Sequence, residues 1–438
     1  MTDGYPVCRL GAVASVQGGF AFKSGDFTET GVPVLKIKNV RLREVDTTEP
    51  AYVDQSVAKD TARYFCKTGD LLISMTGSGP QAPNSVVGRV ARFTGPSDRY
   101  LINQRVGRFV NKAPDKLDQR YLFYVLARHE TLWKLVSVAT GSANQANISG
   151  SQIESLEVPL PPLAEQKAIA AVLGALDDKI ALNRRMNATL EAMARALFQS
   201  WFVDFDPVRA KLDGRKPAAL DPATAALFPE HLEDSPLGHI PKGWKAGGIQ
   251  DCCVQIQNGG TPRRNEPRFW DGGKIPWLAS GEVRQSIITA TNGFITEEGL
   301  AESSAKWVPA FSTVVALYGA TAGQVSFISS RLTTNQAVCA LIPKKDFAFF
   351  NYLTMRGVTS ELENKAVGSA QQNISKGIVE ETKVVLPPSV LVERFAEVAG
   401  PLFERWISNL HQSLNLATLR DTLLPKLLSG ELSVESEH

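Results

Sequence analysis

A long internal duplication is the feature that most constrains how this chain can fold. The stretch GSANQANIS at residues 141–149 is matched by GSAQQNIS at residues 368–375. The Asn-Ile-Ser triplets inside these stretches begin at Asn147 and Asn373, which are 226 positions apart (373 − 147). The two Leu-Pro-Pro triplets that follow have the same separation. Solenoid repeats span only about 20–50 residues, so a period this long predicts two copies of a whole domain plus a helix.

Composition limits the classes of protein that fit. Hydrophobic residues make up 43% and charged residues 21% of the 438 residues, which is ordinary for a globular protein in water. There is no apolar run of about 18 residues, so we expect no membrane span, and the start lacks the features of a signal peptide. The five cysteines form no Cys-x-x-Cys pair, which favours a reducing cytoplasm over a disulfide framework or a zinc site.

The distribution of apolar residues predicts an α+β architecture. Short apolar runs broken by Gly and Pro are typical of β-rich modules, and apolar residues at steps of three and four are typical of long helices. The first module also contains a predicted helix at residues 119–136. The predicted segments are a module at 1–155, a helix at 156–206, a connector at 207–241, a second module at 242–382, a helix at 383–432 and a tail at 433–438.

The two long helices carry apolar stripes that are close to the seam of a coiled coil. A helix of roughly 40 residues is about 60 Å long and overhangs a module of about 150 residues. We therefore expect the two helices to pack side by side, although each could instead pack only on its own module. The predicted packing residues are Ile169, Leu173, Leu176, Ile180, Leu190, Leu197, Phe395, Leu402, Leu410 and Leu414, with Met186, Met193, Val398 and Ile407 in the same stripes.

No catalytic motif is present in the sequence. It has no G-x-x-x-x-G-K-[ST] phosphate loop, no G-x-S-x-G elbow and no H-E-x-x-H zinc motif. The [DN]-P-P-[YF] tetrapeptide of amino-methyltransferases is absent, and DFDPV at residues 204–208 is the nearest match. We therefore predict no catalytic, cofactor-binding or metal-binding residues, although a nucleophile and a base can also meet only in space.

Clusters of basic residues recur in both modules and are the candidate ligand-binding residues. The net charge is only +2, so any affinity for nucleic acid must come from such local clusters. Arg and Lys neutralise phosphates, and Arg, Gln or Asn can read base edges in the major groove. Two related modules suit duplex DNA that is read at two half-sites; the alternative is that each cluster is a solvated strand face. The candidates are Lys36, Lys38, Arg41, Arg43, Arg89, Arg92 and Arg105 in the first module, and Arg263, Arg264, Arg268, Lys274 and Arg284 in the second.

Residues that are identical in the two copies are better candidates for the scaffold. The Asn-Gln pairs at 103–104 and 335–336 could bind adenine. Modules that read two different half-sites, however, should differ at the residues that touch bases. We therefore expect these pairs, the Asn-Ile-Ser triplets and the Gly-Ser-Ala stretches at 141–143 and 368–370 to hold turns or strands near the start of each helix.

Several stretches together resemble the specificity subunit of type I restriction-modification systems. That family's central conserved helix is similar to PLPPLAEQKAIAAVLGALDDKIALNRR (159–185) at its start and LFQSWFVDFDPV (197–208) at its end. Openings of its target-recognition domains are similar to GFAFKSGDF (19–27) and NGGTPRRNEPRFWDGGKIPWLASGEV (258–283). Its C-terminal end is similar to LLPKLLSGEL (423–432). The distal helix departs from the family pattern, because VLVERFAEVAGPLFERWISNL contains Pro401, which we expect to kink the helix or delay its start.

The resemblance implies two α/β target-recognition domains in tandem, each followed by a long helix, with the helices packed as an antiparallel coiled-coil spacer. Each domain would clamp one half of a split, asymmetric sequence in double-stranded DNA. Two methyltransferase subunits and two restriction subunits would be the partners, and they would carry S-adenosylmethionine, ATP and Mg²⁺. This chain would be a non-catalytic cytoplasmic subunit without a membrane contact.

Three other functions fit the same residues. A single-chain enzyme with an unrecognised site would turn over its substrate without partners. A scaffold that uses the helices only for assembly would bind no duplex DNA at any salt concentration. A specificity module of another DNA-modification or phage-defence system would differ only in the identity of its partners.

The implied spacer helices lead to a prediction about target length. One helical turn spans about 5.4 Å, and one base pair spans about 3.4 Å along a strand. Inserting one turn near Arg184 should therefore lengthen the uncontacted gap of the DNA target by one or two base pairs, as measured by sequencing methylated sites. An unchanged gap would show that the helices do not set the spacing.

Overall fold

The computed structural model describes residues 5–79, 86–142, 145–366 and 373–434. The chain forms two compact units, each with its own hydrophobic core. The first unit comprises Met1–Lys179 together with Asn415–His438, and the second comprises Ile180–Leu414. The boundaries between the units fall inside both long helices, so each unit contains part of each helix.

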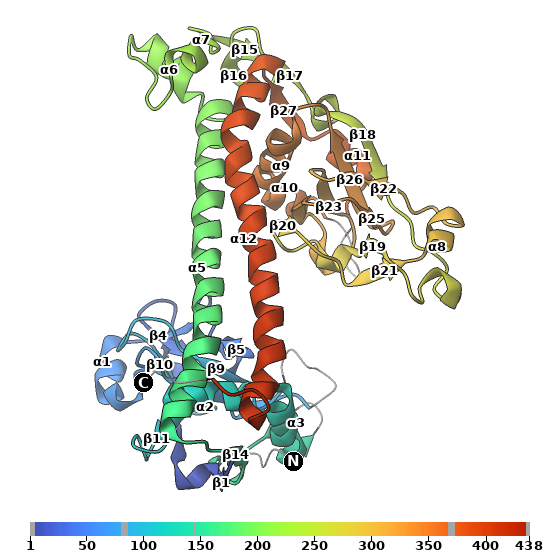
Figure 1. The fold of residues 1–438 in the computed structure, drawn as a ribbon. Helices are drawn as coiled ribbons and strands as arrows, with labels where there is room; N and C mark the ends of the chain where they lie inside the picture. Colours follow the sequence, from blue (N-terminus) through green and yellow to red (C-terminus); the bar gives the residue numbers. More distant parts are fainter. Residues whose placement is uncertain (1–4, 80–85, 143–144, 367–372, 435–438) are drawn as a thin grey trace. The chain divides into compact units, whose positions relative to one another are not determined.

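The first unit contains a five-stranded and a four-stranded sheet (Figure 1). The larger sheet has the order β2 (Ala14–Gly18), β11 (Val106–Asn111), β7 (Leu71–Ser74), β9 (Val90–Arg92) and β5 (Arg43–Glu44). The smaller sheet has the order β10 (Leu101–Ile102), β4 (Val32–Leu35), β6 (Ala51–Val53) and β3 (Phe27–Thr28). A pair of strands, β1 (Val7–Arg9) and β14 (Glu157–Pro159), joins the two ends of the domain. Further elements are β8 (Thr76–Gly77), β12 (Thr140–Ser142), β13 (Gln145–Asn147), α1 (Gln55–Asp60) and α4 (Gly150–Glu154).

The second unit repeats this topology strand for strand in its larger sheet. That sheet has the order β18 (Cys253–Asn258), β26 (Val338–Pro343), β23 (Thr313–Ala316), β24 (Val325–Ile328) and β20 (Ile287–Ile288). The smaller sheet has the order β21 (Gly293–Ile295), β19 (Ile275–Leu278), β25 (Leu332–Thr334) and β22 (Trp307–Val308), and β17 (Lys245–Gly248) pairs with β27 (Lys383–Leu386). Its helices include α8 (Glu297–Ala301), α9 (Ala348–Gly357), α10 (Thr359–Asn364) and α11 (Lys376–Glu380). The duplication is therefore a duplication of a whole α/β domain.

The repeated Asn-Ile-Ser triplets make matching structural contacts in the two domains. The amide of Ile148 donates to the carbonyl of Met75 at 3.0 Å, and the amide of Ile374 donates to that of Leu317 at 2.9 Å. The serines that follow, Ser149 and Ser375, cap α4 and α11 through their side chains. Both isoleucines are buried, and both serines start a helix. The triplets therefore belong to the scaffold. The expected Gly-Ser-Ala stretch at 368–370 and part of that at 141–143 lie outside the described residues.

The repeated Asn-Gln pairs also support strands in the same way. The amide of Asn103 donates to the carbonyl of Leu35 at 3.0 Å, and the amide of Asn335 donates to that of Leu278 at 3.0 Å. Each bond ties the end of one strand in the smaller sheet to the next loop. The backbone of both asparagines therefore has the structural role that their repetition predicts.

The two long helices have the lengths that the stripes predict. Helix α5 (Leu163–Phe202) has 40 residues and helix α12 (Ser389–Ser429) has 41. The expectation that Pro401 delays α12 is wrong, because the helix already begins at Ser389. The carbonyl of Pro388 accepts the amide of Leu391 at 3.0 Å and thereby starts the first turn.

Two other expectations about the elements need correction. The predicted helix at 119–136 is two helices, α2 (Gln119–Leu126) and α3 (His129–Val138), because Arg128 is extended and Thr131 Oγ1 bonds the carbonyl of Val125 at 2.8 Å. The connector at 207–241 is folded and contains α6 (Asp206–Leu212), α7 (Pro222–Ala226), β15 (Leu232–Ser235) and β16 (Gly238–Pro241). Three apolar side chains of the connector, Val208, Phe228 and Ile240, are buried in the core of the second unit.

Within the second unit, α5 and α12 run side by side in antiparallel directions (Figure 1). Asn183 Nδ2 donates to Gln412 Oε1 at 2.9 Å, near one end of this contact. The rings of Phe202 and Phe395, near the other end, have centroids 5.0 Å apart. Asn183 and Asn409 are almost completely buried between the helices, and Asn409 Nδ2 donates to Asn187 Oδ1 at 2.9 Å. Buried polar pairs of this kind fix the register of two helices.

The predicted packing residues are mostly removed from solvent. Ile169, Leu173, Ile180 and Phe395 are buried, and Leu176, Leu190, Leu197, Leu402 and Leu410 are partly buried. Leu414 is 50% exposed, so its assignment to the packed seam is wrong, as it also is for Met193 (51%) and Val398 (39%). A stripe that is extrapolated along a straight helix drifts away from its neighbour. The seam instead uses aromatic residues of α5 that the stripes did not include, namely Phe198, Trp201 and Phe202, whose rings contact Phe395. Phe403 of α12 packs against Phe327, Phe349 and Tyr352 of the second domain.

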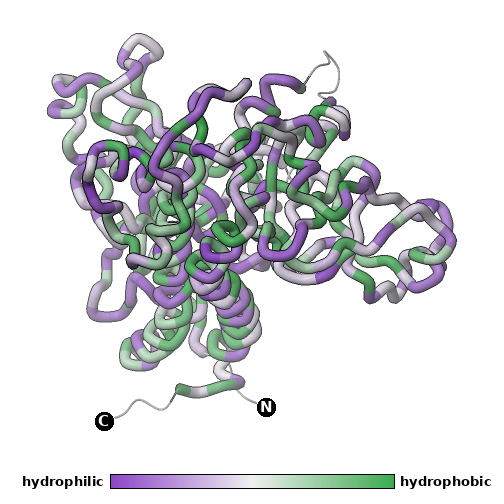
Figure 2. Tube along the Cα trace, turned by 90° about the horizontal axis from the view of Figure 1, so that it is seen from above, coloured by the Kyte–Doolittle hydropathy of each residue, from purple (hydrophilic) through white to green (hydrophobic). Residues whose placement is uncertain are grey.

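In the first unit, the other ends of the same helices join the domain core. Ile169 and Leu173 of α5 share a hydrophobic cluster with Leu424, Leu427 and Leu428 of α12. The helices therefore pack both on the domains and, in the second unit, directly on each other. No helix in the described part of the chain is long and apolar enough to cross a membrane, and Figure 2 shows hydrophobic and hydrophilic residues interspersed along the trace.

The buried amides generate a prediction about stability. Asn409→Ala removes the donor to Asn187 Oδ1 inside the seam, and an unpaired buried polar group costs about 1–3 kcal/mol. We expect the free energy of unfolding to fall by about that amount in a denaturant titration. Asn415→Ala, at an exposed position of the same helix, is the matched control. Equal effects of the two substitutions would show that the amides do not stabilise the seam.

Candidate nucleic-acid interface

The first unit has a basic hollow of about 1050 Å³, here called the first hollow. It is bordered by the 3-10 turn η3 (Ile37–Asn39), by the end of β8 and by α3. Three of the predicted basic residues, Lys38, Arg41 and Arg89, line it. The structure thus brings together candidates that are up to 51 positions apart in sequence (89 − 38). Further lining residues are Thr76, Gly77, Ser78, His129, Leu132, Trp133 and Gln145.

The turn η3 presents two of these cations to solvent. The amide of Lys36 donates to Asn39 Oδ1 at 2.9 Å, which closes the turn. Lys38 pairs with Glu49 at 3.5 Å and Arg41 pairs with Asp46 at 2.5 Å, while their side chains remain 59% and 65% exposed. Hydrogen bonds from Thr48 lower the pKa of Asp46, so this carboxylate stays charged. The Lys38–Glu49 pair is exposed on both sides and contributes little free energy, so Lys38 can exchange its partner for an anionic ligand. The Asp46 side chain is 21% exposed, so Arg41 is held more firmly, although its own side chain reaches solvent.

Arg89 has a different place in the first hollow. Only 6% of its surface is exposed, and its Nη2 donates to the carbonyl oxygen of Ile37 at 3.2 Å. It therefore supports η3 from within the fold. The predicted phosphate contact would require a side chain that projects into solvent, and Arg89 does not project in this way. Its buried charge still contributes to the positive potential of the hollow.

The second unit has a smaller hollow of about 360 Å³ at the same place in the fold, here called the second hollow. It is bordered by the 3-10 turn η7 (Ser280–Glu282) and by η8 (Gly319–Thr321), which follows β23. The amide of Ala279 donates to Glu282 Oε1 at 3.0 Å, which is the bond that Lys36 and Asn39 make in the first unit. Arg284 is exposed at the rim and follows η7 just as Arg41 follows η3. Among the residues that the structure describes, no carboxylate pairs with Arg284.

The two hollows share their framework but differ in their linings. The carbonyl of Arg89 accepts the amide of Ser74 at 3.0 Å, and the carbonyl of Gln324 accepts that of Ala316 at 3.0 Å, so Gln324 is the structural equivalent of Arg89. The side chain of Gln324 donates to Glu363 Oε1 and is held there. The first hollow also has Trp133, which is 44% exposed. Different linings on one framework are what two different ligand sequences require.

Several predicted candidates lie outside the two hollows. Lys36 lies 3.6 Å from the centroid of the Phe27 ring, and Arg92 lines another depression beside Arg108 and Arg120. Arg105 Nη1 donates weakly to Asn147 Oδ1, at 3.4 Å. These contacts leave part of each side chain in solvent, so their role in binding stays a prediction.

Arg43 is held inside the first unit by an ion pair. Its Nη2 lies 3.4 Å from Asp421 Oδ1, and its side chain is 20% exposed. Burial, together with the nearby Arg420, lowers the pKa of its guanidinium, and Asp421 opposes this shift. Arg43 therefore does not present a free cation to a ligand.

The basic cluster at 263–274 is partly neutralised by a neighbouring helix. Arg268 pairs with Glu302 at 2.8 Å and with Glu298 at 3.3 Å, and both glutamates are far away in sequence. The guanidinium of Arg264 lies 5.1 Å from the Trp270 ring and 5.3 Å from the Trp277 ring. Arg263 and Lys274 are exposed. Less charge is available here than the sequence suggests.

Sequence reasoning missed the residues that complete each hollow. His129 and Trp133 lie on α3, Thr76 follows β7, and Ser280, Tyr318 and Thr321 line the second hollow. His129 and Trp133 were missed because a single continuous helix was predicted across Arg128, and such a helix would point these two side chains elsewhere. Gln336 lines the second hollow, and its side chain accepts a short hydrogen bond from Thr261. The sequence predicts a scaffold role for Gln336, and in the structure it also lines the second hollow.

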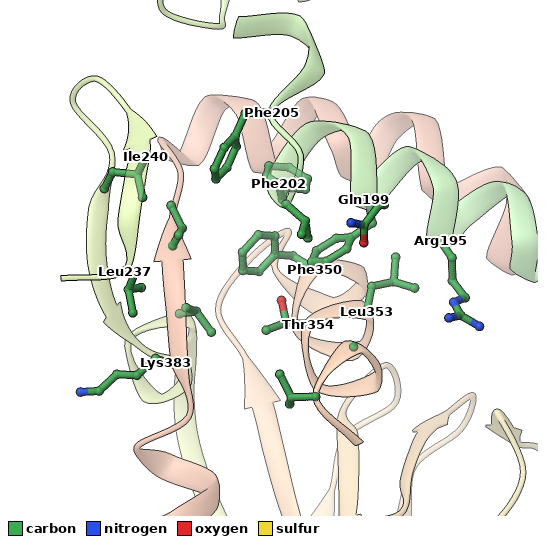
Figure 3. Close-up of a pocket in the computed structure, with 16 residues that line it drawn as sticks. Arg195, Gln199, Phe202, Phe205, Leu237, Ile240, Phe350, Leu353, Thr354 and Lys383 are labelled. Carbon is green, nitrogen blue, oxygen red and sulfur yellow. The ribbon is translucent and has the colours of Figure 1, made fainter. Parts of the chain in front are cut away.

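A third hollow, of about 400 Å³, is apolar (the apolar hollow). Figure 3 shows Phe202, Phe205 and Phe350 gathered in it, with Arg195 and Lys383 on opposite sides of them. Its described lining contains no aspartate or glutamate. Its chemistry is that of a packing surface, and it does not resemble the two polar hollows.

The described residues contain no cluster of three or more His, Cys, Asp or Glu that could hold a metal ion. The cysteines in the described domains are free thiols, and burial raises the pKa of Cys66, Cys252, Cys253 and Cys339 to about 12 in each case. Thiols with such raised pKa values are poor nucleophiles at neutral pH.

Comparisons with known proteins agree on one family. Residues 2–192 and 241–390 match the family described as "Type I restriction modification DNA specificity domain". The HindI specificity subunit of Haemophilus influenzae is 29% identical over 415 residues, which cover 85% of this chain and 88% of that protein. The MjaIX specificity subunit of Methanocaldococcus jannaschii is 26% identical over 440 residues, which cover 98% of this chain and 94% of that protein. The crystal structure of a type I restriction-modification S subunit from M. genitalium has a TM-score of 0.60 at 15% identity, covering 100% of this chain and 98% of that one, which shows likeness of fold.

The exposed arginine of the second hollow leads to a prediction about DNA binding. Arg284→Ala should weaken binding of duplex DNA, because a lost phosphate contact also removes the release of counterions. The slope of the logarithm of affinity against the logarithm of salt concentration should fall by about 0.9. Lys345→Ala, at a side chain that is 87% exposed but lies outside the hollow, is the matched control. An unchanged slope for Arg284→Ala would show that this residue does not touch phosphate.

Proposed function

Because this chain belongs to the type I restriction-modification DNA specificity family, we propose that its two polar hollows bind the two halves of a split sequence in double-stranded DNA. Specificity subunits act in type I complexes with DNA and with other subunits. The proposal goes further, since it assigns the contact with each half-site to particular residues. Arg41 and Lys38 would bind phosphate in the first half-site, and Arg284 would do so in the second.

The observation that carries this proposal is the recurrence of a hollow at one place in both domains. Turns η3 and η7 close with the same backbone-to-side-chain bond, and an exposed arginine follows each of them two residues after the closing residue. Both copies of the domain keep the turn, its closing bond and the exposed arginine, although the side chains that close the turns, Asn39 and Glu282, differ. A ligand with two similar and neighbouring parts explains the recurrence, and duplex DNA has this property.

The differences between the hollows support an asymmetric target. Among the described residues, Trp133 and Arg89 line the first hollow and Tyr318 lines the second, and Gln324 takes the place of Arg89 in the second domain. Base readout depends on the pattern of donors and acceptors. Two different linings should therefore select two different half-sites.

The proposal leaves all chemistry to partner subunits. Two methyltransferase subunits would modify an adenine in each half-site with S-adenosylmethionine, and two restriction subunits would use ATP and Mg²⁺. This chain would contribute no catalytic residue, and it would work in the cytoplasm, where duplex DNA is found. The folded connector and the paired helices offer the partners a fixed framework.

Methylation sequencing tests the proposal. Cells that carry this chain with its neighbouring methyltransferase should gain methyladenine at one bipartite sequence whose two half-sites differ, whereas cells that lack the chain should not. A palindromic target would contradict the asymmetry. If purified chain and methyltransferase together neither bind duplex DNA nor methylate it, the assignment of the hollows is wrong.

A further inference from the structure

In the first unit, charged contacts join the end of α12 to the turn that carries Arg41. Arg43 Nη2 lies 3.4 Å from Asp421 Oδ1. Asp421 also pairs with Arg420 at 2.9 Å, and Arg420 Nη1 donates to Asp177 Oδ1 of α5 at 2.6 Å. The side chains of Arg420 and Asp177 are 13% and 25% exposed, whereas that of Asp421 is 54% exposed, so solvent screens the Arg420–Asp177 pair less than the Arg43–Asp421 pair. The carboxylate of Asp421, on the long helix α12, thus holds Arg43, which lies two positions after Arg41.

In the second unit, α5 makes a corresponding contact with the turn that carries Arg284. Ser286 Oγ donates to the two carboxylate oxygens of Glu191 at 3.2 Å each. Glu191 also lies 3.7 Å from Arg356 of α9, and its side chain is 23% exposed. The carboxylate of Glu191, on the long helix α5, thus holds Ser286, which lies two positions after Arg284 of the second hollow.

The two contacts occupy equivalent positions but use different chemistry. Arg43 and Ser286 are 243 positions apart, as are Arg41 and Arg284 (284 − 41). The first contact is an ion pair and the second is a hydrogen bond from a hydroxyl group. The carboxylates come from different long helices, Asp421 from α12 and Glu191 from α5. Both units therefore have a contact between a long helix and the turn, but different residue types make this contact in the two units.

The contact with the helix adds to other contacts that hold each turn, such as the bonds from Arg89 to the carbonyl of Ile37 in the first unit and from Thr321 to the carbonyl of Ser280 in the second. Each turn leads into a two-residue strand at the edge of a five-stranded sheet, β5 in the first unit and β20 in the second. Arg43 has φ 70°, a left-handed conformation that a residue with a Cβ adopts only at a cost of about 1–3 kcal/mol. Such a conformation persists only where the surroundings impose it.

We propose that Asp421 and Glu191 are positioning residues for DNA recognition: each holds the turn whose arginine contacts its half-site. The inference rests on the proposed function of the two hollows. Neither carboxylate touches DNA in this scheme. Each restricts the range of positions of Arg41 or Arg284, so that less conformational entropy is lost when phosphate binds. The long helices would then determine how well each domain binds, in addition to joining the domains.

Binding of half-site DNA by the full chain with its methyltransferase partner tests this inference. Three duplexes are needed: the bipartite target from methylation sequencing and two versions in which one or the other half-site is scrambled. Asp421→Asn should weaken binding roughly five- to thirtyfold on the duplex that keeps the half-site of the first domain, and little on the other. Glu191→Gln should show the opposite preference. Glu431→Gln in the first unit and Glu397→Gln in the second, which remove ion pairs with Lys426 and Arg394 and leave Arg43 and Ser286 untouched, are the matched controls.

A double-mutant cycle separates positioning from simple loss of stability. If Asp421 acts through Arg41, adding Asp421→Asn to Arg41→Ala should weaken binding no further, because coupled residues are not additive. A purely structural role gives additive losses on both half-sites and a lower melting temperature in thermal denaturation. If Asp421→Asn fails to fold, Arg43→Gln removes the same ion pair from the turn and should give the same pattern.

The possible outcomes distinguish this inference from the proposed function. Non-additive, half-site-specific losses support the positioning role. Unchanged affinity for Asp421→Asn and Glu191→Gln, in a complex that Arg41→Ala or Arg284→Ala does weaken, overturns the positioning role alone. A complex whose binding is unaffected by Arg41→Ala and Arg284→Ala overturns the assignment of the hollows and, with it, the basis of this inference.

Discussion

The hydrogen bonds between buried amides in the seam of α5 and α12 are the constraint on which the rest of the second unit depends. Asn183 and Asn409 have almost no exposed surface, and each makes hydrogen bonds to the opposite helix. A shift of one helix by a turn would leave these groups buried and unpaired, which is costly. The register in turn fixes where Glu191 meets the turn at Ser286. A local hydrogen-bond pattern therefore determines the geometry of a distant binding surface.

Much of the fold could be predicted from the sequence, because it follows from periodic patterns. Apolar residues at steps of three and four fixed both long helices, and the repeated triplets indicated a duplicated domain. The errors arose where the outcome depends on neighbours. Leu414 continues its stripe but leaves the seam, and the seam uses Trp201 and Phe202, whose ring partner Phe395 is contributed by the other helix. The break at Arg128 depends on a hydrogen bond from Thr131 that no propensity scale contains.

The candidate site was less predictable than the fold, since charge along a sequence does not give charge at a surface. Arg268 belongs to a basic run, but glutamates 30 and 34 positions away neutralise much of its charge. Arg43 belongs to another basic run, but it is used inside the fold. Arg41 and Arg284 are exposed, and each lies two residues after a turn that is closed by a hydrogen bond from a backbone amide to a side chain of the turn. The residues that complete the hollows, such as Trp133, come from segments too distant in sequence to be associated with them.

The contact between Asn183 and Asn409 has a consequence for how the two copies can change over evolutionary time. These residues are 226 positions apart, which is the period of the duplication. Two residues that descend from one ancestral position therefore contact each other. A substitution in either copy must be tolerated by the other at once, and the two positions cannot drift independently. At the hollows the two copies already differ, since Gln324 takes the place of Arg89. Selection can therefore diversify what each copy recognises while it keeps the joint between them unchanged.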